Sequence, residues 1–126
     1  MTPYLAQGAA MGIEDAAILG AIFSRAEYTS PSNLPQALQL YEKLRIKRTS
    51  VVATASIGSR WFTQMEDGEE QRKRDEWLLA HPGICNGHIN IRSQKEFLDY
   101  LFGYDAYKAL DEALVEESNS RKSLAK

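Results

Sequence analysis

The chain has 126 residues, 44% of them apolar and 25% charged, with a formal net charge of −2 at pH 7. This composition is typical of one folded domain and excludes a disordered protein. The small net charge gives no reason to expect a nucleic acid or an anionic membrane as a partner.

The first predicted element is a helix over residues 6–26, preceded by a loop over residues 1–5. Its opening turns hold small residues, and Glu14 and Asp15 follow on the favourable side of the helix dipole. The first amides of a helix have no acceptor within the helix, so small side chains leave them open to an anion or a carbonyl oxygen. After Asp15 almost no polar face remains, which is typical of a helix buried on several sides.

A long second helix is predicted after a loop over residues 28–34. Pro35 suits its first turn, apolar residues recur at helical spacing, and Asp67 and Gly68 end it. Its middle, residues 43–48, is strongly basic. A stretch of this kind is more often a solvated helix face than an anion site.

Three shorter helices are predicted in the last half of the chain, over residues 69–80, 94–102 and 104–117. An irregular segment over residues 81–93 and a stop at Gly103 separate them, and residues 118–126 are expected to be a frayed polar tail. No strand is evident that could form a sheet. The expected fold class is therefore all-α, with about five helices.

His81, Cys85 and His88 have the spacing of metal ligands, but a structural zinc site needs a fourth ligand and no second cysteine or third histidine exists. We therefore predict no metal site. Since Cys85 is the single cysteine, an internal disulfide is excluded and a reducing compartment is favoured. The longest strongly apolar run, residues 16–23, is too short to cross a bilayer, and no secretory signal is apparent. We expect a cytoplasmic location.

Residues 3–16 read PYLAQGAAMGIEDA and follow the pattern P-x-x-x-Q-G-x-x-x-x-x-E-D-A. This string resembles the last flavin-contacting segment of FAD-dependent aromatic-ring monooxygenases of the salicylate hydroxylase type. Three later stretches resemble elements of the same family in the same order: YEKLRIKRTSVV, DGEEQRKRDEW and LFGYDA. The resemblance therefore covers nearly the whole chain.

The resemblance implies a cofactor-binding role for four residues near the start of the first helix. The backbone N–H groups of Ala9 and Ala10 would face the N1 and C2-carbonyl edge of the flavin ring. Gly8 would belong to the same turn, and Pro3 would lie beside the ring. No catalytic residue is predicted. Ala6 departs from the glycine that many members of the family carry at this position.

The resemblance also implies a structural role for two arginines of the basic stretch, in a helix that packs behind the flavin helix. Arg45 and Arg48 are three residues apart and would share one side of their helix. From there they could pair with Glu14 or Asp15.

None of the eight glycines forms the dinucleotide-binding fingerprint G-x-G-x-x-G. The resemblance thus implies that residues 1–117 are the C-terminal helical portion of an α/β flavin monooxygenase, without its dinucleotide-binding sheet. The complete enzyme would use FAD, reduced by NADPH or NADH, to hydroxylate an aromatic or enolic small molecule. The missing N-terminal portion would be a partner, and the isolated chain is expected to be inactive. The alternative is a non-catalytic helical remnant or a fragment that docks onto a partner.

Overall fold

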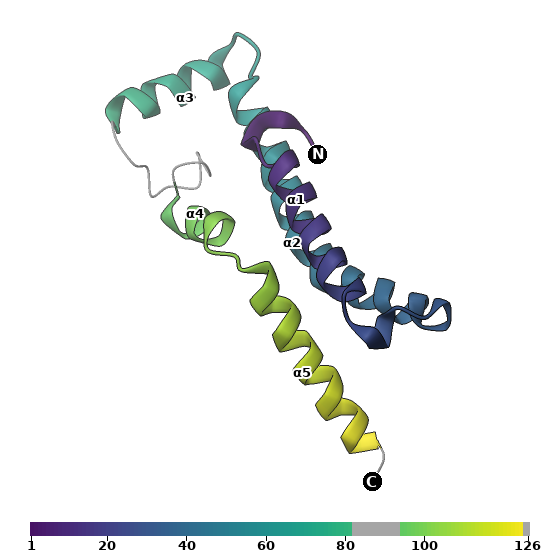
Figure 1. Ribbon diagram of the computed structural model, residues 1–126. Helices are drawn as coiled ribbons and strands as arrows, with labels where there is room; N and C mark the ends of the chain where they lie inside the picture. The colour runs from purple at the N-terminus through teal and green to yellow at the C-terminus, as the bar shows by residue number, and fades with distance from the viewer. Residues whose placement is uncertain (82–93, 125–126) are drawn as a thin grey trace. The chain divides into compact units, whose positions relative to one another are not determined.

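The computed structural model describes residues 1–81 and 94–124, with side chains placed through residue 119. All regular elements of these residues are helical (Figure 1). The α-helices are α1 (Gly8–Phe23), α2 (Leu34–Thr63), α3 (Glu69–Ala80), α4 (Lys95–Phe102) and α5 (Ala106–Leu124), with short 3-10 turns at Pro3–Leu5, Ala26–Tyr28 and Pro31–Asn33. The predicted all-α fold class is confirmed.

Several helix boundaries differ from the predicted ones. α1 begins at Gly8 rather than at residue 6, α2 ends at Thr63, a few residues before Asp67, and α4 begins at Lys95. α1 ends at Phe23 rather than near Ala26, because the chain there turns into the Ala26–Tyr28 segment. α5 begins at Ala106, since the Asp105 carboxylate accepts hydrogen bonds from the amides of Tyr107 and Lys108 at 3.0 Å and so caps the helix. α5 also passes the predicted end and continues to Leu124. Serine and asparagine only mildly disfavour a helix, so the polar residues after 117 do not end it.

The described chain divides into two compact units. The first unit comprises Met1–Gly8 and Val51–Tyr104, and the second comprises Ala9–Ser50 and Asp105–Lys126. No helix in the described ranges is long and apolar enough to cross a membrane.

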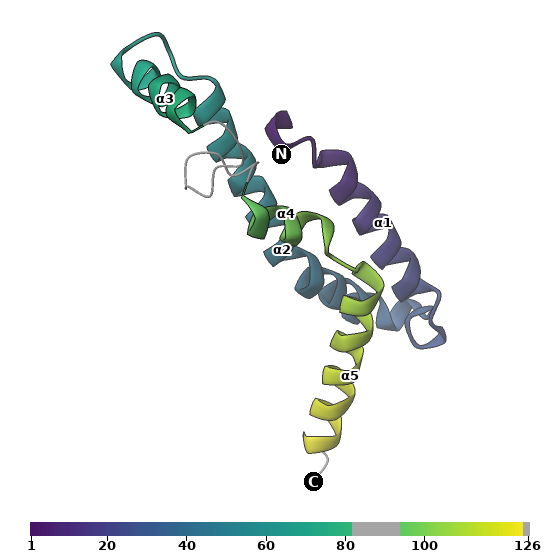
Figure 2. The same cartoon turned by 90° about the vertical axis from the view of Figure 1, so that its left-hand side faces the viewer.

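The core of the second unit is formed by α1, the first half of α2 and the start of α5. Within this unit, residues 9–23 of α1 run antiparallel to the first half of α2, residues 34–50 (Figures 1 and 2). The buried side chains at their contact are Ile18, Ile22, Tyr28, Ala37, Leu40, Leu110 and Ala113. Removal of these apolar surfaces from water is the main force that holds the three helices together.

One face of α1 stays outside this core. Gly12, Ala16 and Gly20 are exposed, and the side chain of Ile13 is 71% exposed. A Cβ atom added to Gly12 or Gly20 would meet no atom within 4 Å. Within the described residues, the apolar surface of this helix is therefore only partly buried. α1 buries one side, through Met11, Ile18 and Ile22, and leaves the other open.

In the first unit, the N-terminal segment is fixed to the second half of α2 by two serine and threonine contacts. The hydroxyl of Ser56 donates to the carbonyl oxygen of Thr2 at 2.5 Å, and the two side-chain oxygens lie 2.7 Å apart. Leu5 is buried beyond them. After this turn the chain reverses at Ala6, whose φ of 54° and ψ of 26° lie in the left-handed region.

Replacing Ala6 by glycine is expected to raise the free energy of unfolding by roughly 0.5–1 kcal/mol, because glycine adopts this region without strain. Chemical denaturation of the full chain measures the change. The matched control is Ala16→Gly at an exposed position inside α1, which should lower the free energy of unfolding by about 1 kcal/mol. A loss of stability in Ala6→Gly as large as in the control would contradict the left-handed conformation.

Candidate functional site

The predicted cofactor-binding residues lie at or just before the start of α1. Pro3 opens the 3-10 turn Pro3–Leu5, and Gly8, Ala9 and Ala10 are the first three residues of α1. Pro3, Gly8 and Ala9 are exposed, and Ala10 is half-buried. The structure thus places three of the four residues consecutively in one helical turn.

The first turn of α1 exposes main chain rather than side chain. A Cβ atom added to Gly8 would meet nothing within 4 Å, and the next two side chains are methyl groups. The amides at the start of a helix lack intrahelical acceptors, and the helix dipole gives this end a partial positive charge. The turn can therefore donate hydrogen bonds to an electron-rich oxygen or nitrogen atom of a ligand.

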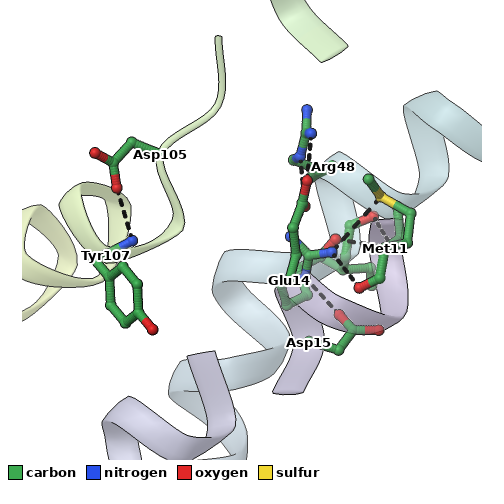
Figure 3. A network of polar contacts seen from close by, with 9 residues as sticks. Met11, Glu14, Asp15, Arg48, Asp105 and Tyr107 are labelled. Atoms are coloured by element: carbon green, nitrogen blue, oxygen red, sulfur yellow. Dashed lines mark hydrogen bonds and ion pairs between the residues drawn. The ribbon is translucent and has the colours of Figure 1, made fainter. Parts of the chain in front are cut away.

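Further along α1, four charged side chains of α1 and α2 form a compact network (Figure 3). Arg45 donates from Nε to Asp15 at 2.6 Å and from Nη1 to Glu14 at 2.6 Å. Arg48 donates two hydrogen bonds to Glu14, from Nε at 2.9 Å and from Nη2 at 2.7 Å, one to each carboxylate oxygen. Such paired, charge-assisted hydrogen bonds are strong and directional.

Both arginines of the network are buried, with 2% of Arg45 and 3% of Arg48 exposed. Two positive and two negative groups balance each other, which a buried cluster requires because unpaired ions are costly away from water. The sequence-based pairing of Arg45 and Arg48 with Glu14 or Asp15 is confirmed. Of the basic stretch, only Lys43 and Lys47 fit a solvated face, since both are exposed.

Arg45 also reaches the main chain of α1. Its Nη2 donates to the carbonyl oxygen of Met11 at 3.3 Å and lies 3.7 Å from the Met11 sulfur. Met11 directly follows Ala10 and is 4% exposed. This main-chain contact was not predicted from the sequence, where Met11 carries no signal beyond an apolar helix position.

The network alters the pKa of one of its members, Glu14, and contributes to a shift in the pKa of the neighbouring Tyr41. Burial raises the pKa of Glu14, but the hydrogen bonds and charges of Arg48 and Arg45 outweigh it, so that the pKa lies below its ordinary value. Burial of Tyr41, together with the negative charge and hydrogen bond of Asp15, raises the pKa of the Tyr41 hydroxyl. At neutral pH, Glu14 is therefore ionised and Tyr41 is neutral.

The predicted absence of a metal site concerns His81, Cys85 and His88, and the last two lie outside the described residues. His81 stacks on Trp77 with ring centroids 4.5 Å apart, and its Nδ1 donates to the Trp77 carbonyl oxygen at 2.9 Å. Within residues 1–81 and 94–124, no group of His, Cys, Asp and Glu side chains is arranged to hold a metal ion.

Several characterised proteins are similar to this chain. It is 32% identical over 115 residues to the FAD-dependent monooxygenase OpS4 of Beauveria bassiana. This match covers 91% of this chain and 26% of the relative. It is 32% identical over 136 residues to the 6-methylsalicylate 1-monooxygenase atA of Aspergillus terreus, covering 99% of this chain and 26% of that protein. It is 43% identical over 67 residues to the 6-hydroxynicotinate 3-monooxygenase of Bordetella bronchiseptica, covering 53% of this chain and 17% of that enzyme.

The chain is thus homologous to the FAD-dependent monooxygenases over most of its length, and the resemblance read from its sequence is confirmed. It spans only 26% of the length of the two fungal relatives. No family model and no solved structure matches the chain.

Proposed function

We propose that this chain forms one wall of the flavin site in an FAD-dependent monooxygenase. The main-chain amides of Ala9 and Ala10 face the N1 and C2-carbonyl edge of the flavin ring, Gly8 opens the turn, and Pro3 lies beside the ring. The observation that carries the proposal is the exposed first turn of α1, made of small residues, in a chain homologous to this family.

The residues of the turn fit the electron-rich N1 and C2-carbonyl edge of a flat ring. Gly8 has no side chain, and the space where one would lie is open. The side chain of Met11, the next residue, is buried against Arg45, so it is not among the exposed side chains of the turn. Donors that are fixed before a reaction favour negative charge that develops beside them, because no reorganisation is needed.

FAD, when bound, supplies the redox chemistry, and NADPH or NADH is the proposed reductant. The role of this chain is to hold and polarise one edge of the ring. Two relatives are named for a methylsalicylate and a hydroxynicotinate, so we assign an aromatic or enolic small molecule as the substrate class. We place the enzyme in the cytoplasm and assign residues 1–117 to its C-terminal helical portion. The polar tail over residues 118–126 begins inside α5, which continues to Leu124.

The complementing portion of the enzyme is its partner in this proposal. A chimera, in which this chain replaces the corresponding segment of the Beauveria relative, tests the function directly. We expect it to purify with bound FAD and to oxidise NADPH or NADH in the presence of an aromatic substrate. A chimera that folds but excludes FAD would contradict the proposal and favour a non-catalytic helical remnant.

The isolated chain is expected not to bind FAD tightly. Two amides that contact one ring edge cannot hold a dinucleotide whose pyrophosphate and adenosine groups have no binding site. Titration of the full chain into FAD, followed by flavin fluorescence, should show no saturable quenching at roughly micromolar concentrations. A stoichiometric yellow complex would contradict this expectation.

A further inference from the structure

We propose that Arg45 is a positioning residue for the flavin-facing end of α1, an inference that rests on the proposed function. Its guanidinium group connects α2 to the carboxylates of Glu14 and Asp15 in α1. It also connects α2 to the Met11 carbonyl oxygen, which belongs to the first turn of α1.

The contacts of Arg45 converge on the part of α1 that follows Ala10. Nε binds Asp15, Nη1 binds Glu14, and Nη2 reaches the Met11 carbonyl oxygen at 3.3 Å. The Met11 carbonyl belongs to the first turn of α1, and Glu14 and Asp15 belong to the second. With its side chain only 3% exposed, Arg45 has little freedom to follow a displaced helix. A shift of the first turn would therefore break at least one of the three bonds.

The chemistry of the guanidinium group makes arginine specific for this task. It is planar and directs several N–H groups in fixed directions, whereas a lysine offers one compact ammonium group on a flexible stem. Apolar replacements of buried ion pairs are often no less stable than the pairs themselves. An apolar contact does not fix the orientation of the helix end, whereas directional hydrogen bonds do. The amides of Ala9 and Ala10 need such a fixed orientation to face the flavin.

Arg48 provides a matched comparison within the same network. It is also an arginine, it is also buried, with 3% of its surface exposed, and it forms a bidentate hydrogen-bonded pair with Glu14. Arg48→Lys weakens the same cluster and leaves the bond from Arg45 to Met11 in place. The two lysine variants therefore separate positioning of the first turn from general stabilisation of the network.

Amide hydrogen exchange of the full chain tests whether Arg45 holds the first turn of α1 in place. The amides of residues 12–16 bond to carbonyl oxygens of the first turns of α1, and those of residues 19–23 report the second half of the helix. In Arg45→Lys we expect exchange at residues 12–16 to accelerate by about tenfold or more, and at residues 19–23 by less than about threefold. Arg48→Lys should accelerate exchange at residues 12–16 by less than about threefold.

Uniform acceleration along α1, or equal acceleration in Arg45→Lys and Arg48→Lys, would overturn the proposal. Should Arg45→Lys fail to fold, Asp15→Asn removes one charged partner of Arg45 and keeps the Glu14–Arg48 bond. It should produce a smaller acceleration confined to the same residues, and no acceleration there would also overturn the proposal.

The FAD-loaded chimera tests the link to the flavin. We expect Arg45→Lys to raise the dissociation constant of FAD by about tenfold, and Arg48→Lys by less than about threefold. Faster exchange at residues 12–16 with an unchanged FAD dissociation constant would overturn the positioning role. A chimera with the unaltered chain that binds no FAD would overturn the proposed function itself, which separates the two failures.

Discussion

Replacing Glu14 by glutamine is expected to lower the free energy of unfolding by about 3–5 kcal/mol, because it leaves two buried guanidinium groups without their shared anion. Glu14 accepts one hydrogen bond from Arg45 and two from Arg48, through Nε and Nη2, and 18% of its side chain is exposed. A neutral amide keeps the size of the side chain and loses its charge. Since whole domains are stable by only about 5–15 kcal/mol, the loss would be large.

Denaturant unfolding of the full chain, followed by circular dichroism, measures this change. The matched control is Glu116→Gln, which breaks the exposed pair with Lys43 at 3.2 Å. Because both side chains of that pair are more than half exposed, the control should lose no more than about 1 kcal/mol. A Glu14→Gln variant as stable as the control would show that the network does not hold α1 to α2.

The pH dependence of stability follows from the same carboxylate. The pKa of Glu14 in the folded chain lies below its ordinary value of 4.5, so its ionised form stabilises the fold. This stabilisation is fully present above pH 4.5 and is lost as the pH falls below that value, through the pKa of the folded state. The unaltered chain should therefore lose stability in this acidic range, and Glu14→Gln should lose less of it.

Replacing Ala9 by proline in the chimera is expected to lower the rate of hydroxylation by about 100- to 1000-fold, the usual cost of removing one preorganised donor. Proline is tolerated in the first turn of a helix because an amide there has no intrahelical acceptor. Gly8, which precedes it, has no Cβ atom to clash with the proline ring. The substitution thus removes the N–H group assigned to the flavin and changes the helix little.

Steady-state turnover with NADPH and the FAD content of the purified chimera measure this effect. Lys43→Ala is the control, since Lys43 is exposed and lies outside the proposed flavin site. It should leave the rate nearly unchanged. Full flavin content together with an unaltered hydroxylation rate in Ala9→Pro would mean that the start of α1 does not contact the flavin.

The helices were predictable because apolar spacing, proline and glycine mark them in the sequence. The pairing of Arg45 and Arg48 with the Glu14–Asp15 pair was predictable from the resemblance and from the three-residue spacing of the arginines. The contact between Arg45 and the Met11 carbonyl was not, since a main-chain acceptor leaves no mark in the sequence. The left-handed conformation of Ala6 was hidden for a related reason, because alanine does not signal it as glycine does.

The element that covers the open face of α1 could not be predicted from the sequence. The run from Ala16 to Phe23 leaves the helix almost no polar face, which is typical of a helix that packs against several neighbours. The described residues cover one side only. Hydrophobicity tells how much surface a helix gains by burying, but it does not tell which element covers that surface. The assignment of Pro3, Gly8, Ala9 and Ala10 to the flavin depends in the same way on the resemblance, and it stays a prediction.

A crystal structure of the FAD-loaded chimera is the most direct test of the flavin contact. The distances that matter are those from the backbone nitrogens of Ala9 and Ala10 to the N1 and O2 atoms of the flavin ring. We expect both nitrogens to lie at hydrogen-bond distance from this edge, about 2.7–3.2 Å. A flavin whose N1 and O2 atoms lie beyond about 3.6 Å from both nitrogens, or whose edge is held by other donors, would contradict the proposed role of α1.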